Sequence, residues 1–156
     1  MQSENIHEEK TSILVVDDKK ENIVAIEAVL APLGLNIIPA SSGQEALRQL
    51  LHHEVAMILM DVSMPIMNGF ETATLIRERE SLKNVPIVFI TGIAFGQEEY
   101  LKGYTLGAVD YIYKPVIPGV LAAKVQVFIN LFKMKKAVEL QAKKISLTNE
   151  IGRAHV

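Results

Sequence analysis

Charged residues that could do chemistry follow three short apolar runs of the chain. Asp17 and Asp18 come directly after one such run, Asp61 after a second and Lys114 after a third. A buried strand that ends on a charged residue holds that residue at the edge of a sheet, which is where ligands usually bind. The sequence therefore predicts one site that is assembled from distant parts of the chain.

The residue types at these positions suit phosphoryl chemistry. Three carboxylates at one sheet edge repel one another unless a cation or a proton lies between them, and oxygen-only ligands favour a hard cation, with Mg²⁺ the first choice. Lys114 is a point charge suited to a phosphate or carboxylate oxygen, and the hydroxyl of Thr91 can donate to a phosphoryl oxygen. Together these groups predict a phosphoryl-transfer site in which a carboxylate is the nucleophile.

The elements that must position these residues alternate between short strands and amphipathic helices. Strands are expected at 12–16, 36–40, 56–60, 86–91 and 110–113, and helices at 21–33, 44–51, 70–79, 97–106 and from 118 onward. Several strands are apolar throughout, which is typical of parallel strands covered on both faces. Five such units predict an α/β fold with a doubly wound parallel sheet. With strand order 2-1-3-4-5, the order reverses between the first and third strands, where the acidic residues lie.

Helix ends are marked by local signals. Gly34 is expected to stop the first helix, and Pro118 suits the first turn of the last one. Glu45 follows Ser42 by three residues, which is the spacing of a capping box at the start of the second helix.

Composition restricts the class of protein. The chain has 156 residues, 49% of them hydrophobic and 22% charged, with a net charge of -2 and no cysteine. These values favour one globular domain, argue against a nucleic-acid partner, and exclude disulfides and thiolate metal sites. No apolar run approaches the ~20 residues that span a bilayer, so no membrane partner is expected and a cytoplasmic location fits. We expect a mobile polar tail at 1–11, a domain at 12–131 and a helical extension at 132–156.

The motifs together resemble the receiver domain of two-component response regulators. In chain order these motifs are Asp17-Asp18, Asp61-x-x-Met64-Pro65-x-Met67-x-Gly69, Thr91, Gly107-Ala108-x-Asp110-Tyr111 and Lys114-Pro115. The resemblance extends over roughly Ser12 to Leu131. It implies a flavodoxin-like five-stranded parallel sheet of order 2-1-3-4-5, here with an extended C-terminal helix.

The resemblance also implies a role for each acidic residue. Asp61 would accept a phosphoryl group from a phosphohistidine on a sensor histidine kinase or a histidine phosphotransfer protein. Asp18, helped by Asp17 and the backbone carbonyl of Ser63, would hold Mg²⁺. Beyond its own phosphorylation and dephosphorylation, the chain is not expected to be an enzyme.

Three further residues take roles by the same resemblance. Thr91 and Lys114 would bind phosphoryl oxygens. Tyr111 would turn inward as Thr91 moves toward the phosphate, which would change the surface formed by helix 4, strand 5 and helix 5. Among the departures from the family pattern, Gly92 stands where alanine is more common, Val116 stands where phenylalanine is common, and the apolar Ile93 offers no group to position attacking water. We therefore expect a phosphoryl lifetime longer than that of the chemotaxis receiver.

Other interpretations remain open at this point. A phosphohydrolase that uses an aspartyl phosphate would need an acid two residues after Asp61, where this chain has Ser63. A flavin carrier would need a phosphate-binding loop after the first strand, where the acidic pair would repel phosphate. A receiver that acts without phosphorylation would not need the intact acidic set. Taken singly, Asp17 could cap the first helix, Thr91 could be an ordinary strand residue and Tyr111 could be core.

The C-terminal helix carries an apolar seam with three-four spacing, interrupted by Lys124 and Gln141. Its members are Val120, Val127, Leu131, Met134, Val138 and Ile145. Such spacing is typical of a coiled coil, and a helix to Ser146 would extend about 40 Å. A solvated helix packed on its own domain accounts for the early positions only. We expect the helix either to form a homodimer or to join a downstream module, with a hybrid histidine kinase as the preferred parent.

Overall fold

The computed structural model describes residues 9–92 and 97–154. Its elements are β1 (Ser12–Val16), α1 (Lys20–Leu30), η1 (Ala31–Leu33), β2 (Asn36–Ala40), α2 (Gly43–His52), β3 (Ile58–Asp61), α3 (Gly69–Glu78), η2 (Glu80–Leu82), β4 (Ile87–Thr91), α4 (Gln97–Thr105), β5 (Ala108–Tyr113) and α5 (Pro118–Ala154). The strands form one parallel sheet in the order β2-β1-β3-β4-β5, which confirms the predicted topology. The N-terminal tail predicted to be mobile lies largely outside the described residues.

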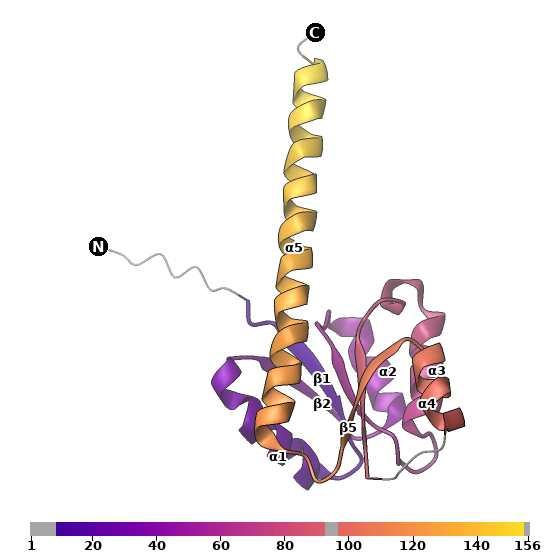
Figure 1. Ribbon diagram of the computed structural model, residues 1–156. Helices are drawn as coiled ribbons and strands as arrows, with labels where there is room; N and C mark the ends of the chain where they lie inside the picture. The colour runs from indigo at the N-terminus through magenta and orange to yellow at the C-terminus, as the bar shows by residue number, and fades with distance from the viewer. Residues whose placement is uncertain (1–8, 93–96, 155–156) are drawn as a thin grey trace.

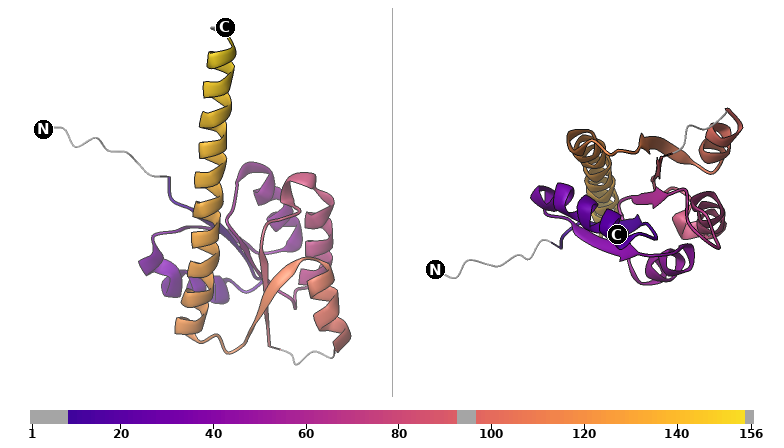
Figure 2. Two further views of the ribbon diagram at one scale, coloured as in Figure 1. Left: turned by 45° about the horizontal axis from the view of Figure 1, so that its top comes forward. Right: turned by 90° about the horizontal axis from the view of Figure 1, so that it is seen from below.

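Helices cover both faces of the sheet, and alternate residues of each strand point to opposite faces. On β1, Ile13 and Val15 pack in one buried cluster with residues of α1 and α5, whereas Leu14 and Val16 pack in a second cluster with residues of α2 and α3. Figures 1 and 2 show the same division, with α1 and α5 on one side of the sheet and α2 and α3 on the other. This burial on both faces explains why the central strands are apolar throughout.

Several element ends differ from the sequence-based expectations. β3 begins at Ile58 rather than at residue 56, and it includes Asp61 as its last residue. α1 ends at Leu30 and continues as a 3-10 turn, because Pro32 has no N–H to donate to the preceding helical turn. Gly34 then adopts a left-handed conformation with φ of 65°, as its predicted role as a helix stop requires.

The predicted capping box at α2 is wrong in one of its two bonds. The hydroxyl of Ser42 accepts a hydrogen bond from the Glu45 backbone, as expected. The Glu45 carboxylate, however, accepts from the backbone and hydroxyl of Ser41, because Ser41 offers it two donors. A complete capping box that the sequence analysis did not predict begins α3, where Asn68 and Glu71 each accept from the backbone of the other.

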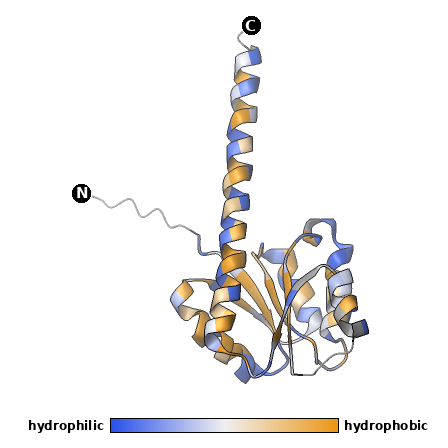
Figure 3. Ribbon diagram, viewed as in Figure 1, coloured by the Kyte–Doolittle hydropathy of each residue, from blue (hydrophilic) through white to orange (hydrophobic). Residues whose placement is uncertain are grey.

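The C-terminal helix α5 packs on the domain for its first turns and then projects away from it (Figure 1). Leu121, Val125 and Ile129 are buried, whereas the residues from Lys133 to Arg153 are exposed. Figure 3 shows hydrophobic and hydrophilic residues alternating along the projecting part. Within the described residues, no helix is both long and apolar enough to cross a membrane.

Candidate functional site

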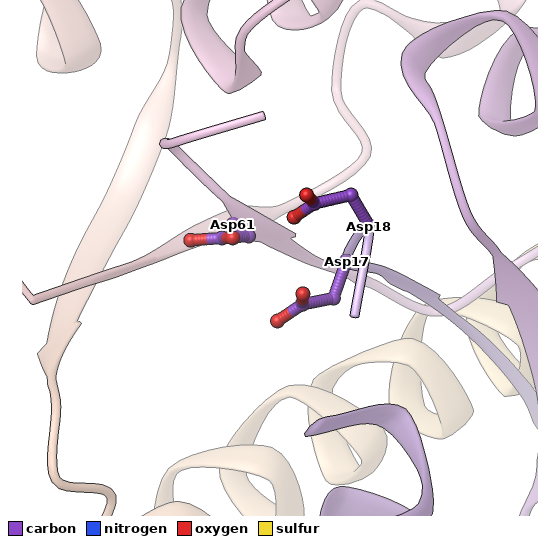
Figure 4. A group of neighbouring side chains, drawn as sticks. All are labelled: Asp17, Asp18 and Asp61. Atoms are coloured by element: carbon purple, nitrogen blue, oxygen red, sulfur yellow. The ribbon is translucent and has the colours of Figure 1, made fainter. Parts of the chain in front are cut away.

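The carboxyl ends of β1 and β3 bring three acidic residues together. Asp61 ends β3, and Asp17 and Asp18 directly follow β1. Asp17 and Asp61 are 2% and 4% exposed, so neither carboxylate is well hydrated. One carboxylate oxygen from each residue lies within 4.8 Å of those of the other two, as Figure 4 illustrates. Since β1 and β3 are hydrogen-bonded neighbours, the switch in strand order itself produces this cluster.

Hydrogen bonds from the chain that follows hold Asp17 in place. One carboxylate oxygen accepts from the backbone of Lys19 at 2.9 Å, and the other accepts from the side-chain amide of Asn22 at 3.1 Å. The N-cap position of α1 is Lys19, which makes no side-chain capping bond. Asp17 therefore shapes the turn into α1 without capping the helix backbone, and its carboxylate stays at the cluster.

Lys114, which follows β5, reaches the acidic cluster from the other side of β3. Its Nζ lies 3.4 Å from Asp61 Oδ1 and 3.8 Å from Asp17 Oδ2. The backbone N–H of Lys114 donates to the carbonyl of Thr91 at 2.8 Å, which ties the end of β5 to the end of β4. The Lys114–Pro115 peptide bond is cis. Thr91 is 1% exposed at the end of β4, so four strand ends meet around one small volume.

The electrostatics of the site oppose ionisation of Asp61. Burial raises the pKa of the Asp61 carboxyl above its ordinary value, and the neighbouring Asp17 charge raises this pKa further. The ammonium of Lys114 and the backbone N–H of Ser63 lower the pKa of Asp61, but by less than burial and Asp17 raise it. A second positive charge beside Asp61 would therefore favour the ionised nucleophile.

The acidic cluster has the donor set that a hard cation requires. Oδ1 of Asp18 is buried, and it finds no hydrogen-bond partner among the parts of the chain that the structure describes. A buried carboxylate oxygen without a partner is costly unless a cation occupies the space beside it. Together with Asp17 and Asp61 it offers three carboxylate oxygens, which suits Mg²⁺ with water completing its octahedral shell. The residues present thus fit a magnesium site.

Comparison with known proteins places this arrangement in a family. A family model described as "Response regulator receiver domain" matches residues 13–126, which is most of the chain. The chain belongs to the response regulator receiver domain family. The matched segment contains every residue that the sequence analysis assigned to the site.

Relatives of this receiver domain include regulators of several kinds. The transcriptional regulatory protein YvrH of Bacillus subtilis is 41% identical over 119 residues, which cover 76% of this chain and 48% of YvrH. A probable cyclic di-GMP phosphodiesterase of Vibrio cholerae is 37% identical over 114 residues, which cover 73% of this chain and 25% of the relative. The chain therefore spans about half of the first relative's length and a quarter of the second's.

Solved structures of receiver domains share the fold. The chemotaxis protein CheY4 of Vibrio cholerae superposes with a TM-score of 0.71 at 28% identity, covering 76% of this chain and 98% of that one. A signal receiver domain of a signal transduction histidine kinase from Syntrophus aciditrophicus gives a TM-score of 0.69 at 27% identity, covering 77% of this chain and 90% of that one. The match to the family model ends at residue 126, before the part of α5 that projects from the domain.

Tyr111, the residue assigned as the aromatic switch, lies inward in this receiver domain. It is 5% exposed, and its ring lies 5.7 Å from the rings of Phe89 and Tyr104, measured between centroids. Its hydroxyl points at Gly103 of α4, where an added Cβ would collide with the oxygen. Of the positions that depart from the family pattern, Gly92 is exposed and Ile93 lies outside the described residues.

Arg77 is a structural residue that sequence reasoning missed. Its guanidinium donates to the backbone carbonyls of Leu106 and Leu82 at 2.7 Å each and to that of Gly107 at 3.1 Å. The bonds to Leu106 and Gly107 tie α3 to the turn between α4 and β5, and the bond to Leu82 ties it to η2. Burial lowers the pKa of Arg77. An arginine on the polar face of a predicted helix normally indicates a solvent-exposed residue, so the sequence gives no signal for this role.

Proposed function

We propose that this receiver domain is a phosphorylatable switch in which Asp61 accepts a phosphoryl group from a phosphohistidine. The donor would be a sensor histidine kinase or a histidine phosphotransfer protein, and transfer would require Mg²⁺. The observation that carries the proposal is the buried Asp61 carboxylate, which lies between two further carboxylates and the ammonium of Lys114. A site of this charge pattern supports phosphoryl transfer to a carboxylate.

The transfer step follows from the chemistry of these groups. A carboxylate oxygen of Asp61 attacks phosphorus, the P–N bond of the phosphohistidine breaks, and the imidazole leaves and takes up a proton. Lys114 stabilises the negative charge of the phosphoryl oxygens, and the Thr91 hydroxyl donates to one of them. Mg²⁺ held by Asp17, Asp18, Asp61 and the Ser63 carbonyl would neutralise charge on the carboxylate and the phosphoryl group.

The output of the switch would be the surface formed by α4, β5 and α5. Thr91 ends β4 beside the site, and Tyr111 lies on the adjacent strand β5 against α4. A movement of Thr91 toward a phosphoryl group would open or close the space that the Tyr111 ring occupies. The inward ring and its close contact with Gly103 support a coupling between the site and α4.

The setting of the switch follows from the same proposal. We place the receiver unit at residues 12–131, the helical extension at 132–156 and the protein in the cytoplasm. The extension would form a homodimer or connect to a downstream module, and a hybrid histidine kinase is the parent we favour. No direct contact with nucleic acid or membrane is proposed.

Because Ile93 brings no polar group, we also propose slow loss of the phosphoryl group, which Ile93→Glu should accelerate.

The test is intact-mass analysis after incubation with Mg²⁺ and acetyl phosphate. We expect one added phosphoryl group on the wild-type chain, and none on Asp61→Asn or on wild-type protein treated with a chelator. Addition to Asp61→Asn at the wild-type level would contradict the assignment of the acceptor. Addition without any divalent cation would contradict the role of Mg²⁺.

A further inference from the structure

The projecting part of α5 has an apolar face that the described residues of its own domain leave largely uncovered. Four of its residues between Leu131 and Ile145 are more than half exposed, with values of 53% for Leu131, 64% for Met134, 69% for Val138 and 53% for Ile145. Among the residues that the structure describes, one ion pair joins this segment to the domain, between Lys136 and Glu54. An isolated helix of this length is marginal in water and usually gains its stability from packing. This helix would therefore gain stability from a partner helix.

The exposed apolar residues continue the three-four spacing of a coiled coil. In heptad terms, Leu131, Val138 and Ile145 occupy a positions, and Val127, Met134 and Gln141 occupy d positions. Val127 lies two residues after the buried Val125, and Leu131 lies two residues after the buried Ile129. Two residues correspond to a rotation of about 200° around a helix. Leu131, near the start of the seam, borders a hollow that Glu54 and Pro86 of the domain also line. From Met134 onward the seam lies on the projecting part of the helix, so a partner helix can approach it there without meeting the domain.

The flanking positions of the seam tolerate a second copy of the same helix. In a parallel pair, each e position lies beside the g position five residues earlier on the partner helix. Here the pairs are Lys135 with Asn130, Ala142 with Ala137 and Asn149 with Lys144. Although the helix is rich in lysine, no two lysines oppose each other across these pairs. The charge pattern is therefore compatible with self-association.

The position of Gln141 favours the parallel, in-register arrangement. In that arrangement Gln141 lies opposite its own copy, and the two amides can hydrogen-bond to each other. An antiparallel pair centred on the seam would place Gln141 against Leu131 and leave the buried amide unsatisfied, which is costly. A single polar residue in an apolar seam sets orientation and register in this way.

We infer that α5 binds the α5 of a second copy of this chain in a parallel two-stranded coiled coil, with a seam from Val127 to Ile145. The two receiver domains lie at the same end of the coiled coil, on its outer sides. This inference names the partner of the helical extension. It rests on the proposed function only for the use of the dimer in signalling, because association is measured without any phosphoryl donor.

Sedimentation velocity of the whole chain, over dilutions that span about two orders of magnitude in protein concentration, tests the interface. We expect the wild type to be a dimer, and Val138→Glu to raise the dimer dissociation constant roughly 100-fold or more, since it buries a carboxylate in the seam. Leu140→Glu is the matched control, because Leu140 is also exposed (56%) but lies outside the seam. Urea unfolding of both variants checks that the domain is intact. A monomeric wild type, or equal effects of both substitutions, would overturn the inference.

Cysteine cross-linking tests the orientation, and the natural chain has no cysteine to interfere. Under mild oxidation, Ile145→Cys should form a disulfide-linked dimer, because residue 145 meets its own copy in a parallel seam. Leu147→Cys, on the other side of the helix, should not. In an antiparallel pair centred on the seam, residue 145 would face residue 127, and its two copies would lie about 27 Å apart along the axis. A dimer that resists cross-linking at 145 would therefore overturn the parallel arrangement.

Discussion

The ionisation of Asp61 links the chemistry of the site to the stability of the fold. Burial and the Asp17 charge hold the pKa of Asp61 above its ordinary value of 3.8, so the folded protein binds this proton more tightly than the unfolded chain does. Proton binding to Asp61 therefore stabilises the folded state. This stabilisation is complete below pH 3.8 and is lost as the pH rises through the folded-state pKa of Asp61. At neutral pH and without a metal ion, the ionised Asp61 carboxylate therefore destabilises the folded domain.

Replacing Asp61 by asparagine should stabilise the metal-free domain. At pH 7.5, we expect Asp61→Asn to raise the free energy of unfolding by about 1–3 kcal/mol, because it removes one of the mutually repelling carboxylates. The gain should shrink as the pH falls toward 4, where the wild-type carboxyl binds its proton. Urea unfolding across this pH range, with chelator present, measures both effects. A variant less stable than wild type at pH 7.5 would show that the cluster is not repulsive.

Arg77 provides a second residue-scale prediction. Arg77→Met keeps the length of the side chain but removes three hydrogen bonds to backbone carbonyls, so we expect a loss of about 2–4 kcal/mol in the free energy of unfolding. Arg79→Met is the control, since Arg79 donates to one carbonyl, that of Leu47. Equal losses in the two variants, measured by urea unfolding, would argue against a special role for Arg77.

At the scale of elements, the close approach of α4 and β5 depends on Gly103. The Tyr111 hydroxyl occupies the space that a side chain at residue 103 would need. Glycine is otherwise unfavourable inside a helix, by about 1 kcal/mol relative to alanine. The inward position of Tyr111 is thus obtained at the expense of helix propensity in α4.

Gly103→Ala should destabilise the domain by about 1–3 kcal/mol, because the Tyr111 ring must leave its site between Phe89 and Tyr104. In a Tyr111→Ala background, the same change should be neutral or stabilising, as helix propensity predicts. Gly119→Ala serves as the control, since an added Cβ at Gly119 meets nothing within 4 Å. Calorimetry of the four variants measures these effects, and a destabilising Gly103→Ala in both backgrounds would contradict the explanation.

The elements show where sequence reasoning succeeds and where it stops. The strand order and the meeting of Asp17, Asp18, Asp61 and Lys114 could be predicted, because apolar runs and charged strand ends are local patterns whose geometry is fixed by a parallel sheet. The helical spacing predicts too late an end for α1, because the spacing continues through Pro32 although the proline ends the hydrogen bonding. The bonding partners of Glu45 could not be predicted, because they depend on which nearby donors its carboxylate reaches.

At the scale of the whole molecule, the receiver domain and the projecting helix are nearly independent. From Lys133 onward the residues of α5 are exposed, and the ion pair of Lys136 with Glu54 lies on the surface. Surface ion pairs contribute little to stability, typically below about 1 kcal/mol. The domain should therefore keep its fold without the extension.

Truncation after Phe132 tests this independence. We expect the free energy of unfolding of the domain to change by less than about 1 kcal/mol when measured on monomeric protein, while the helical signal in circular dichroism decreases. Phosphorylation by acetyl phosphate should be retained, because no site residue lies beyond Lys114. Loss of phosphorylation in a truncated chain that is still folded would show that the helix acts on the site.

Identification of the phosphorylated residue tests the central claim most directly. After incubation with Mg²⁺ and acetyl phosphate, borohydride reduction converts an aspartyl phosphate to homoserine, which peptide mass spectrometry locates in the sequence. We predict homoserine at position 61 in the phosphorylated wild type and its absence from samples without acetyl phosphate. Homoserine at position 17 or 18 instead, or a phosphoryl group on a residue that borohydride does not reduce, would contradict the account.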